Sequence, residues 1–102
     1  MLQLRPVCEH CAVLLPPSSS VAMICSFECT FCQTCVHDLL ANVCPNCGGG
    51  FCPRPIRPRN HWKNGNYLGE APAETLWLHR PVDLEEHARF AEPLQKIEPS
   101  NR

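Results

Sequence analysis

All nine cysteines of this chain lie between Cys8 and Cys52, and their spacing suits metal binding. A Cys-x-x-Cys turn places two thiolates on one edge of a tetrahedron, about 3.8 Å long for Zn–S bonds of ~2.3 Å. Two such turns complete one four-sulfur site. A single pair is also typical of a redox motif, but overlapping pairs in one short segment predict metal binding. The pairs are Cys8/Cys11, Cys29/Cys32, Cys32/Cys35 and Cys44/Cys47.

The residues around the first cysteine favour metal over disulfides. The segment from Met1 to Cys8 has no apolar region of signal-peptide length and no cleavage site. No stretch approaches the ~18 apolar residues of a transmembrane helix. We therefore expect a cytoplasmic protein, and structural disulfides are rare in a reducing cytosol. An odd number of cysteines also fits a disulfide framework poorly.

Eight cysteines form a series that resembles the RING family, whose members cross-brace two zinc ions. The series is Cys8-x2-Cys11-x13-Cys25-x3-Cys29-x2-Cys32-x2-Cys35-x8-Cys44-x2-Cys47. Cys29 stands where most members have histidine. Thr30-Phe31-Cys32 is similar to the family's aromatic-then-cysteine run, and Cys44-Pro45-Asn46-Cys47 matches its terminal Cys-Pro-x-Cys.

The resemblance covers roughly residues 6–50 and implies two Zn²⁺ ions per chain, each held by four cysteines. It also implies which cysteines share an ion. Cys8, Cys11, Cys32 and Cys35 would form site 1, and Cys25, Cys29, Cys44 and Cys47 would form site 2.

Other arrangements of the same ligands remain open. The pairs Cys32/Cys35 and Cys44/Cys47 are similar to the two halves of a rubredoxin or zinc ribbon, although the gap between them is short for a ribbon hairpin. A serial arrangement would join the first four cysteines in one site. Iron also fits a four-cysteine site, but zinc is the usual ion in closed thiolate tetrahedra.

Three further residues could reach a metal. Cys52 is expected to be a spare thiol outside the module, with replacement of Cys25 or Cys29 as the alternative. His10 and His37 lie close to the cysteines in sequence. Because eight cysteines already fill two sites, we expect both histidines at the surface.

A hairpin and a short helix must position these ligands. The apolar run Val21–Ile24 predicts a strand that leads into Cys25, and Phe27 and Phe31 flank Cys29 as a second strand would. After Cys35, apolar residues spaced i, i+3, i+4 predict one helical face, and Asn42 and Pro45 should end that helix. The resulting fold class is a small metal-stabilised α+β fold of treble-clef type. The core candidates are Val7, Val13, Ile24, Phe31, Leu39 and Leu40.

The composition divides the chain in two. Residues 1–52 form the cysteine-rich module, and residues 53–102 form an extension that begins as a Pro/Arg-rich linker. Asp83 and Glu86 have the spacing of a capping box, which predicts a short helix near 84–92 that Pro93 ends or kinks. Because the core of the module is small, metal binding should supply much of its folding free energy. The apolar residues of the extension suggest that it packs on the module or on another protein.

The sequence argues against an enzyme. Two closed four-thiolate sites leave no open position for a catalytic water. The Pro-Cys-x-x-Cys and His-x-Glu motifs of zinc deaminases and a thioredoxin-like pattern are absent. Ubiquitin ligases of the RING family usually carry an apolar residue in the first knuckle, where this chain has Glu9 and His10, and many place a basic residue where this chain has Gly48. We therefore expect no ligase activity.

Three segments carry a second resemblance: residues 1–8, the run Ile24–Cys32, and Cys44–Gly49. In these segments the chain resembles a family of short bacterial proteins of unknown function, DUF1272. The resemblance implies a bacterial cytosolic protein without an assigned function, and bacteria generally lack the ubiquitin pathway.

Charge decides between partner classes. Residues 1–52 hold one basic residue and three acidic ones, and each zinc bound by four thiolates adds two formal negative charges. This half should not bind phosphate. We expect an interaction or adaptor module with a protein partner and no membrane partner. The alternative is a nucleic-acid-associated protein that uses the basic segment 54–63 and Trp62. A redox sensor that releases zinc on oxidation is a weaker alternative.

Overall fold

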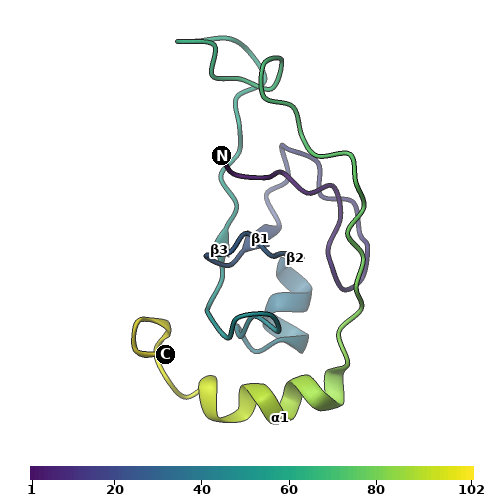
Figure 1. The fold of residues 1–102 in the computed structure, drawn as a ribbon, viewed down its shortest axis with the longest axis vertical. Coiled ribbons are helices and arrows are strands. Elements are labelled where there is room, and N and C mark those ends of the chain that lie inside the picture. Colours follow the sequence, from purple (N-terminus) through teal and green to yellow (C-terminus); the bar gives the residue numbers. More distant parts are fainter.

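The computed structural model describes all residues, 1–102, and places a small three-stranded sheet at the centre of the molecule (Figure 1). The elements follow one another in the order β1, β2, η1, β3, α1 and η2. Their bounds are β1 Ala22–Ile24, β2 Thr30–Cys32, η1 Cys35–Leu39, β3 Cys52–Pro53, α1 Leu84–Leu94 and η2 Pro99–Asn101. None of the helices combines the length and the apolar content needed to cross a lipid bilayer. The predicted small α+β fold class is confirmed.

β1 is the middle strand of the sheet, with β2 on one side and β3 on the other, both antiparallel to it. Met23 lies opposite Phe31 in β2 and opposite Pro53 in β3. The predicted hairpin is therefore present, and its turn runs from Cys25 to Cys29. Glu28 in that turn has a φ of 66°. The third strand was not predicted, because two residues before a proline-rich segment carry no strand pattern.

The predicted helix after Cys35 is a single wide turn, η1. It is closed by the Leu40 N–H, which donates to the Cys35 carbonyl at 2.9 Å, five residues back. Ala41 and Asn42 then adopt positive φ values and end the helix, as expected for Asn42. The wide turn rotates the apolar stripe: Val36 and Leu40 are fully buried, whereas Leu39 is exposed.

The core lies between the sheet, η1 and the first knuckle, and four of the six core candidates belong to it. Val7, Ile24, Phe31 and Leu40 are buried as expected. Val13 and Leu39 are corrections, because both are exposed. Six further apolar residues are buried although they were not among the core candidates: Leu4, Leu15, Ala22, Met23, Val36 and Val43.

The extension wraps around the module. In Figure 1 it leaves β3 as a loop that projects beyond the N-terminus, returns along the module and crosses the opposite end as α1. α1 spans 84–94, and Asp83 caps it by accepting the N–H groups of Glu85 and Glu86 at 3.1 Å. The predicted helix and its cap are therefore confirmed. Pro93 does not end the helix, which runs one residue further to Leu94.

Arg54 is the anchor at the start of the extension. Its backbone N–H donates to the Ala22 carbonyl, and its side chain is only 4% exposed. The guanidinium donates to the carbonyls of Arg5, Leu15 and Pro16 at 2.9–3.1 Å. Burial lowers the pKa of Arg54 from its ordinary value. Arg54 thus holds the first loop of the module against β3. The division into a module of residues 1–52 and an extension of residues 53–102 stays a prediction.

Candidate metal centre

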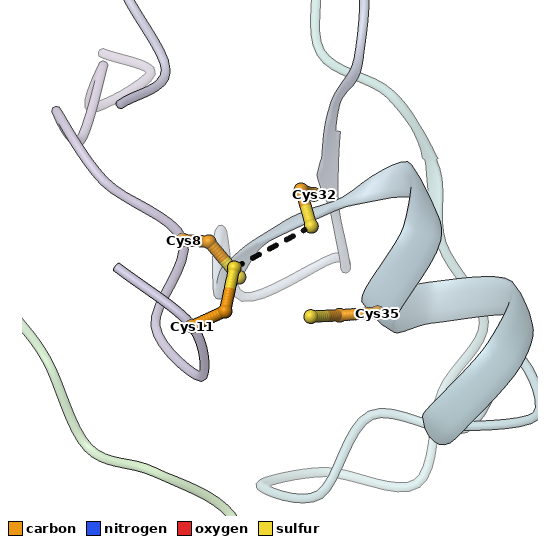
Figure 2. Close-up of side chains that lie close together, drawn as sticks. All are labelled: Cys8, Cys11, Cys32 and Cys35. Carbon is orange, nitrogen blue, oxygen red and sulfur yellow. Dashed lines mark hydrogen bonds between the residues drawn. The ribbon is translucent and has the colours of Figure 1, made fainter. Parts of the chain in front are cut away.

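The first knuckle and the segment from β2 to η1 bring four sulfurs together. The Sγ atoms of Cys8, Cys11, Cys32 and Cys35 all lie within 4.8 Å of one another. Figure 2 shows the four side chains pointing into one space. Cys11 Sγ and Cys32 Sγ are 3.8 Å apart, the edge length of a four-sulfur zinc tetrahedron. These are the four residues expected in site 1.

The local chain conformation explains why the first knuckle closes. The Cys8 carbonyl accepts the Ala12 N–H, and the Cys8 N–H donates to the Val13 carbonyl, both at 2.9 Å. Ala12 has a φ of 62°, which reverses the chain directly after Cys11. Cys32 ends β2 and Cys35 begins η1, so the strand-to-helix junction supplies the other pair.

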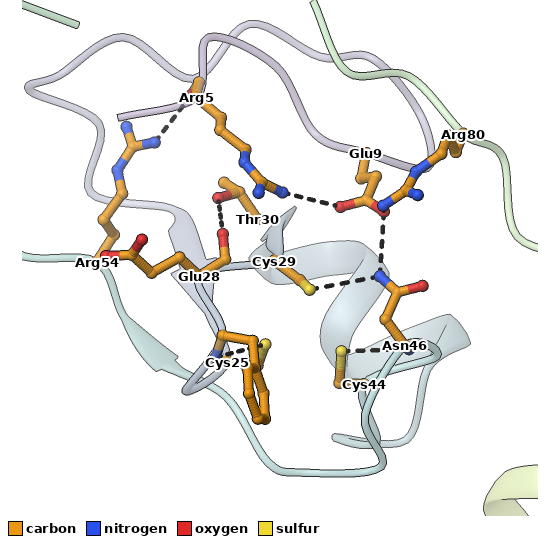
Figure 3. Close-up of polar contacts among 11 residues, drawn as sticks. Arg5, Glu9, Cys25, Glu28, Cys29, Thr30, Cys44, Asn46, Arg54 and Arg80 are labelled. Atoms are coloured by element: carbon orange, nitrogen blue, oxygen red, sulfur yellow. Dashed lines mark hydrogen bonds and ion pairs between the residues drawn. The ribbon is translucent and has the colours of Figure 1, made fainter. Parts of the chain in front are cut away.

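A second group of sulfurs lies between the hairpin turn and the last knuckle. The Sγ atoms of Cys25, Cys44 and Cys47 lie within 4.8 Å of one another. Cys29 does not meet that limit with all three. Its sulfur nevertheless faces the same space as those of Cys25 and Cys44 in Figure 3. The four residues expected in site 2 are thus neighbours, with Cys29 displaced.

Each sulfur of the second group accepts an N–H group. The donors to Cys25, Cys44 and Cys47 are the backbone N–H groups of Phe27, Asn46 and Gly49, at 3.3–3.4 Å. The donor to Cys29 is the side-chain amide of Asn46, at 3.4 Å (Figure 3). N–H donors stabilise the thiolate form that a metal requires. These donors therefore favour metal binding at this group.

Burial works against ionised thiols in the absence of a metal. It is the main cause that raises the pKa of Cys29, Cys35 and Cys44 above the ordinary thiol value. For Cys29 the Asn46 amide acts in the opposite direction and lowers the pKa. A cation placed among the sulfurs would remove the cost of ionising them, so the donor sets fit a bound metal ion.

A buried carboxylate links the two sulfur groups. Glu9, inside the first knuckle, is 3% exposed. It accepts from Asn46 Nδ2 at 3.1 Å and from Arg80 at 2.7 Å, and Arg5 lies 3.5 Å away (Figure 3). Asn46 therefore joins Glu9 to Cys29. Sequence spacing could not reveal this contact, because its partners lie 37 residues apart.

The remaining metal candidates lie outside both groups. Cys52 is exposed on β3, and His37 is exposed on η1. His10 Nδ1 accepts the Val82 N–H at 2.9 Å, so His10 holds the extension in place. No histidine joins a cluster of metal-capable side chains.

The sequence matches a family model and an uncharacterised relative. Residues 1–57 match the model of a family described as "Protein of unknown function (DUF1272)". An uncharacterised protein of Rhizobium meliloti (strain 1021) is 48% identical over 81 residues, which cover 79% of this chain and 89% of that protein. The chain belongs to the DUF1272 family. No solved structure matches it. The DUF1272 segment contains all nine cysteines and the Arg54 anchor, so the resemblance noted in the sequence is confirmed.

Proposed function

We propose that this DUF1272 protein is a RING-like, double-zinc interaction module. The observation that carries the proposal is the order in which the cysteines group. Taken along the chain, the eight cysteines form the successive pairs Cys8/Cys11, Cys25/Cys29, Cys32/Cys35 and Cys44/Cys47. The first and third of these pairs share one cluster, and the second and fourth lie around the other. Alternating pairs of this kind define a cross-brace, whereas a serial or ribbon arrangement would group neighbouring pairs.

Zinc is the ion that best suits these ligands. Each group offers cysteine sulfurs alone, four within 4.8 Å of one another in the first group and three in the second, with Cys29 beside them. Zinc is the usual ion of four-cysteine structural sites. A structural ion would also supply the folding free energy that so small a core lacks.

The first test is the metal content of protein purified without added metal, with a thiol count after chelation. Two zinc ions per chain and loss of fold on chelation are the expected results. One zinc, or iron, would contradict the proposal and favour the ribbon arrangement.

A double variant tests the pairing. Cys8→Ser with Cys32→Ser removes two ligands from one cross-braced site and should leave one metal per chain. In the serial arrangement these residues belong to different sites, so the variant would lose both ions. In the ribbon arrangement Cys32→Ser would remove a ligand of the single ion, and no metal would remain. Cys25→Ser with Cys44→Ser is the matched variant for the other site. Cys52→Ser should retain both ions.

The interaction role rests on what the extension leaves exposed. Trp62 is 79% exposed, and Leu76 and Trp77 are also largely exposed. Apolar side chains of this size favour a protein partner. Co-migration of the purified protein with one cellular protein that is lost in the Trp77→Ala variant would support this role. Co-migration that persists in Trp77→Ala would contradict it.

The nucleic-acid alternative depends on the four basic residues of segment 54–63, and two of them already make contacts within the protein. Arg54 is buried, and Arg57 donates to the carbonyls of Leu2 and Ala71 at 2.7 Å. Only Arg59 and Lys63 remain exposed beside Trp62. Retention on a phosphate matrix near physiological salt separates the classes, since a protein-binding module predicts none.

The position of Glu9 also argues against ligase activity. In RING ligases the apolar residue expected here meets the conjugating enzyme. In this protein Glu9 is buried under Arg80, and the Arg80 N–H donates to the Glu9 carbonyl at 2.8 Å. The extension therefore covers the part of the first knuckle that would contact a conjugating enzyme in a RING ligase.

A further inference from the structure

A cavity of about 360 Å³ opens where the two knuckles meet the extension. Glu9 and Asn46 line it from the knuckles, Arg80 and Asp83 from the segment before α1, and Glu86 and His87 from α1. Figure 3 shows Glu9, Asn46 and Arg80 at this junction. No cysteine lines the cavity, so it is separate from the two sulfur groups.

The cavity wall is acidic. It carries the carboxylates of Glu9, Asp83 and Glu86 against one guanidinium, that of Arg80. Arg80 is already paired with Glu9. Asp83 directs Oδ1 at two N–H groups of α1, but these are neutral and leave its charge uncompensated. Because Arg80 and Arg5 both lie against Glu9, its charge is compensated. The uncompensated negative charge of the wall therefore belongs to Asp83 and Glu86. A concave wall with a net negative charge attracts cations.

His87 adds a buried acceptor to this wall. The residue is 4% exposed, and its Nε2 lies 3.0 Å from the Leu40 carbonyl. A carbonyl only accepts, so Nε2 carries the ring proton and Nδ1 of the neutral ring is an acceptor. This Nδ1 is buried and has no hydrogen-bond partner. A buried polar atom without a partner is unusual in native proteins and favours a group that brings a donor.

We propose that this cavity binds the ammonium or guanidinium group of one basic side chain from a partner protein. Its N–H groups would meet the Glu86 carboxylate and the His87 acceptor, and Pro45 and Phe90 would flank its aliphatic stem. The proposal rests on the interaction role above and specifies the chemistry of the partner.

Other ligands suit the cavity less well. A carboxylate or phosphate would lie beside the carboxylates of Asp83 and Glu86, and the His87 Nδ1 acceptor offers it no hydrogen. A metal ion would need several ligands close together, and the clusters of metal-capable side chains in this protein consist of cysteines alone. The volume is near the lower end for small-molecule sites, which suits one side chain better than a cofactor.

The test uses the full zinc-loaded chain and three probes: Nα-acetyl-arginine amide, Nα-acetyl-lysine amide and the uncharged Nα-acetyl-norleucine amide. We expect the two cations to shift the amide signals of Glu86 and the Nδ1 signal of His87, and the norleucine compound to leave them unchanged. Equal shifts with all three probes, or none with the cations, would overturn the proposal.

A matched pair of variants locates the site. Glu86→Gln removes a carboxylate from the cavity wall and should weaken binding of the arginine compound about threefold to fivefold. Glu85→Gln, on the same turn of α1 but outside the wall, should not change it. Equal binding by wild type and Glu86→Gln would overturn the proposal.

Zinc content measured on the same samples separates this inference from the proposed function. Full zinc content without shifts overturns the cavity proposal and leaves the zinc module intact. A folded chain without zinc overturns the zinc module, while cation-specific shifts in that chain would still support the cavity.

Discussion

At the residue scale, the sulfur groups depend on polar side chains from distant parts of the chain. Asn46 is the clearest case. Its side-chain amide donates to Glu9 at 3.1 Å and to Cys29 at 3.4 Å, so it stands between a buried carboxylate and a thiolate. Hydrogen bonds around the ligands of a metal commonly fix their orientation. Asn46 therefore provides the direct hydrogen-bonded link between the first knuckle and the second metal site.

Replacing Asn46 tests this link. Asn46→Ala should lower the zinc affinity of the second site about tenfold, the lower end for loss of a hydrogen bond to a ligand. Competition with a chromophoric chelator measures the affinity. Asn60→Ala, in the exposed loop, is the control and should match wild type. Equal affinities in both variants would mean that Asn46 does not support the site.

Arg54 gives a second prediction at this scale. Arg54→Lys keeps the charge but loses the fork that reaches three carbonyls. The buried charge would then have fewer partners, and we expect a loss of about 2 kcal/mol in unfolding free energy. Arg59→Lys, at an exposed position, should cost almost nothing. Equal stability of the two variants in urea unfolding would contradict the anchoring role.

Residue spacing predicted which cysteines would meet but not what surrounds them. Cys-x-x-Cys turns are local, so their geometry can be inferred from a few neighbouring residues. The contacts of Glu9 with Asn46 and Arg80, and those of the Arg54 guanidinium, join residues 37 to 71 positions apart along the chain. In the sequence, Glu9 is notable only for its place in the first knuckle and Arg54 only as part of the basic segment 54–63, and neither contact has a sequence pattern that would predict it.

At the element scale, α1 and the last knuckle pack on each other through Gly48. Gly48 follows the last cysteine of that knuckle. In the structure Gly48 is buried with a φ of 79°, and a Cβ there would lie 3.2 Å from Leu94 Cδ1 and 3.4 Å from Phe90 Cζ. Only glycine combines this backbone conformation with such close packing.

Gly48→Ala should therefore disturb α1 as well as the knuckle. We expect a cost of about 1–2 kcal/mol from the left-handed backbone, plus displacement of α1. Gly65→Ala is the matched control, because Gly65 also has a positive φ, of 70°, but nothing nearer than 4.0 Å. The unfolding free energies of the two variants measure these costs. Amide exchange in α1 should accelerate only in Gly48→Ala. Equal exchange in both would show that α1 does not rest on Gly48.

The predictions for elements failed where packing overrides local pattern. Leu39 lies on the expected helical stripe, but the wide turn η1 moves it out of the core. Val13 follows a knuckle whose positive-φ residue, Ala12, redirects the chain. By contrast, α1 was predicted correctly because Asp83 and the apolar stripe are local signals.

At the scale of the whole molecule, the extension supplies positive charge to an acidic module. Arg80 reaches Glu9, and Arg102 donates to the carbonyls of Asn42 and Gly48 at 3.0–3.1 Å. Two zinc ions with four thiolates each would make the module still more negative. The extension therefore completes the fold, and the ligands, the charge balance and the core depend on one another.

This dependence gives a prediction about pH. Thiols must lose their protons to bind zinc, so acidification should release both ions and unfold the chain in one transition. In a metal-free fold the raised pKa of Cys29, Cys35 and Cys44 would make stability change with pH in the opposite direction. Those thiols favour that fold below the ordinary thiol pKa of about 8.5, and the contribution is lost as the pH rises. Acid unfolding that coincides with zinc release is therefore a signature of the metal-loaded form.

The measurement follows zinc release and circular dichroism together as the pH falls from about 8 to 4, a range below the ordinary thiol pKa. We expect the two signals to coincide and to shift to higher pH when a chelator is present, because chelator and protons both compete for the ions. Cys52→Ser should give the same curve, since Cys52 lies outside both sulfur groups. A fold that survives complete loss of zinc would show that the core and the extension hold the module together without the metal.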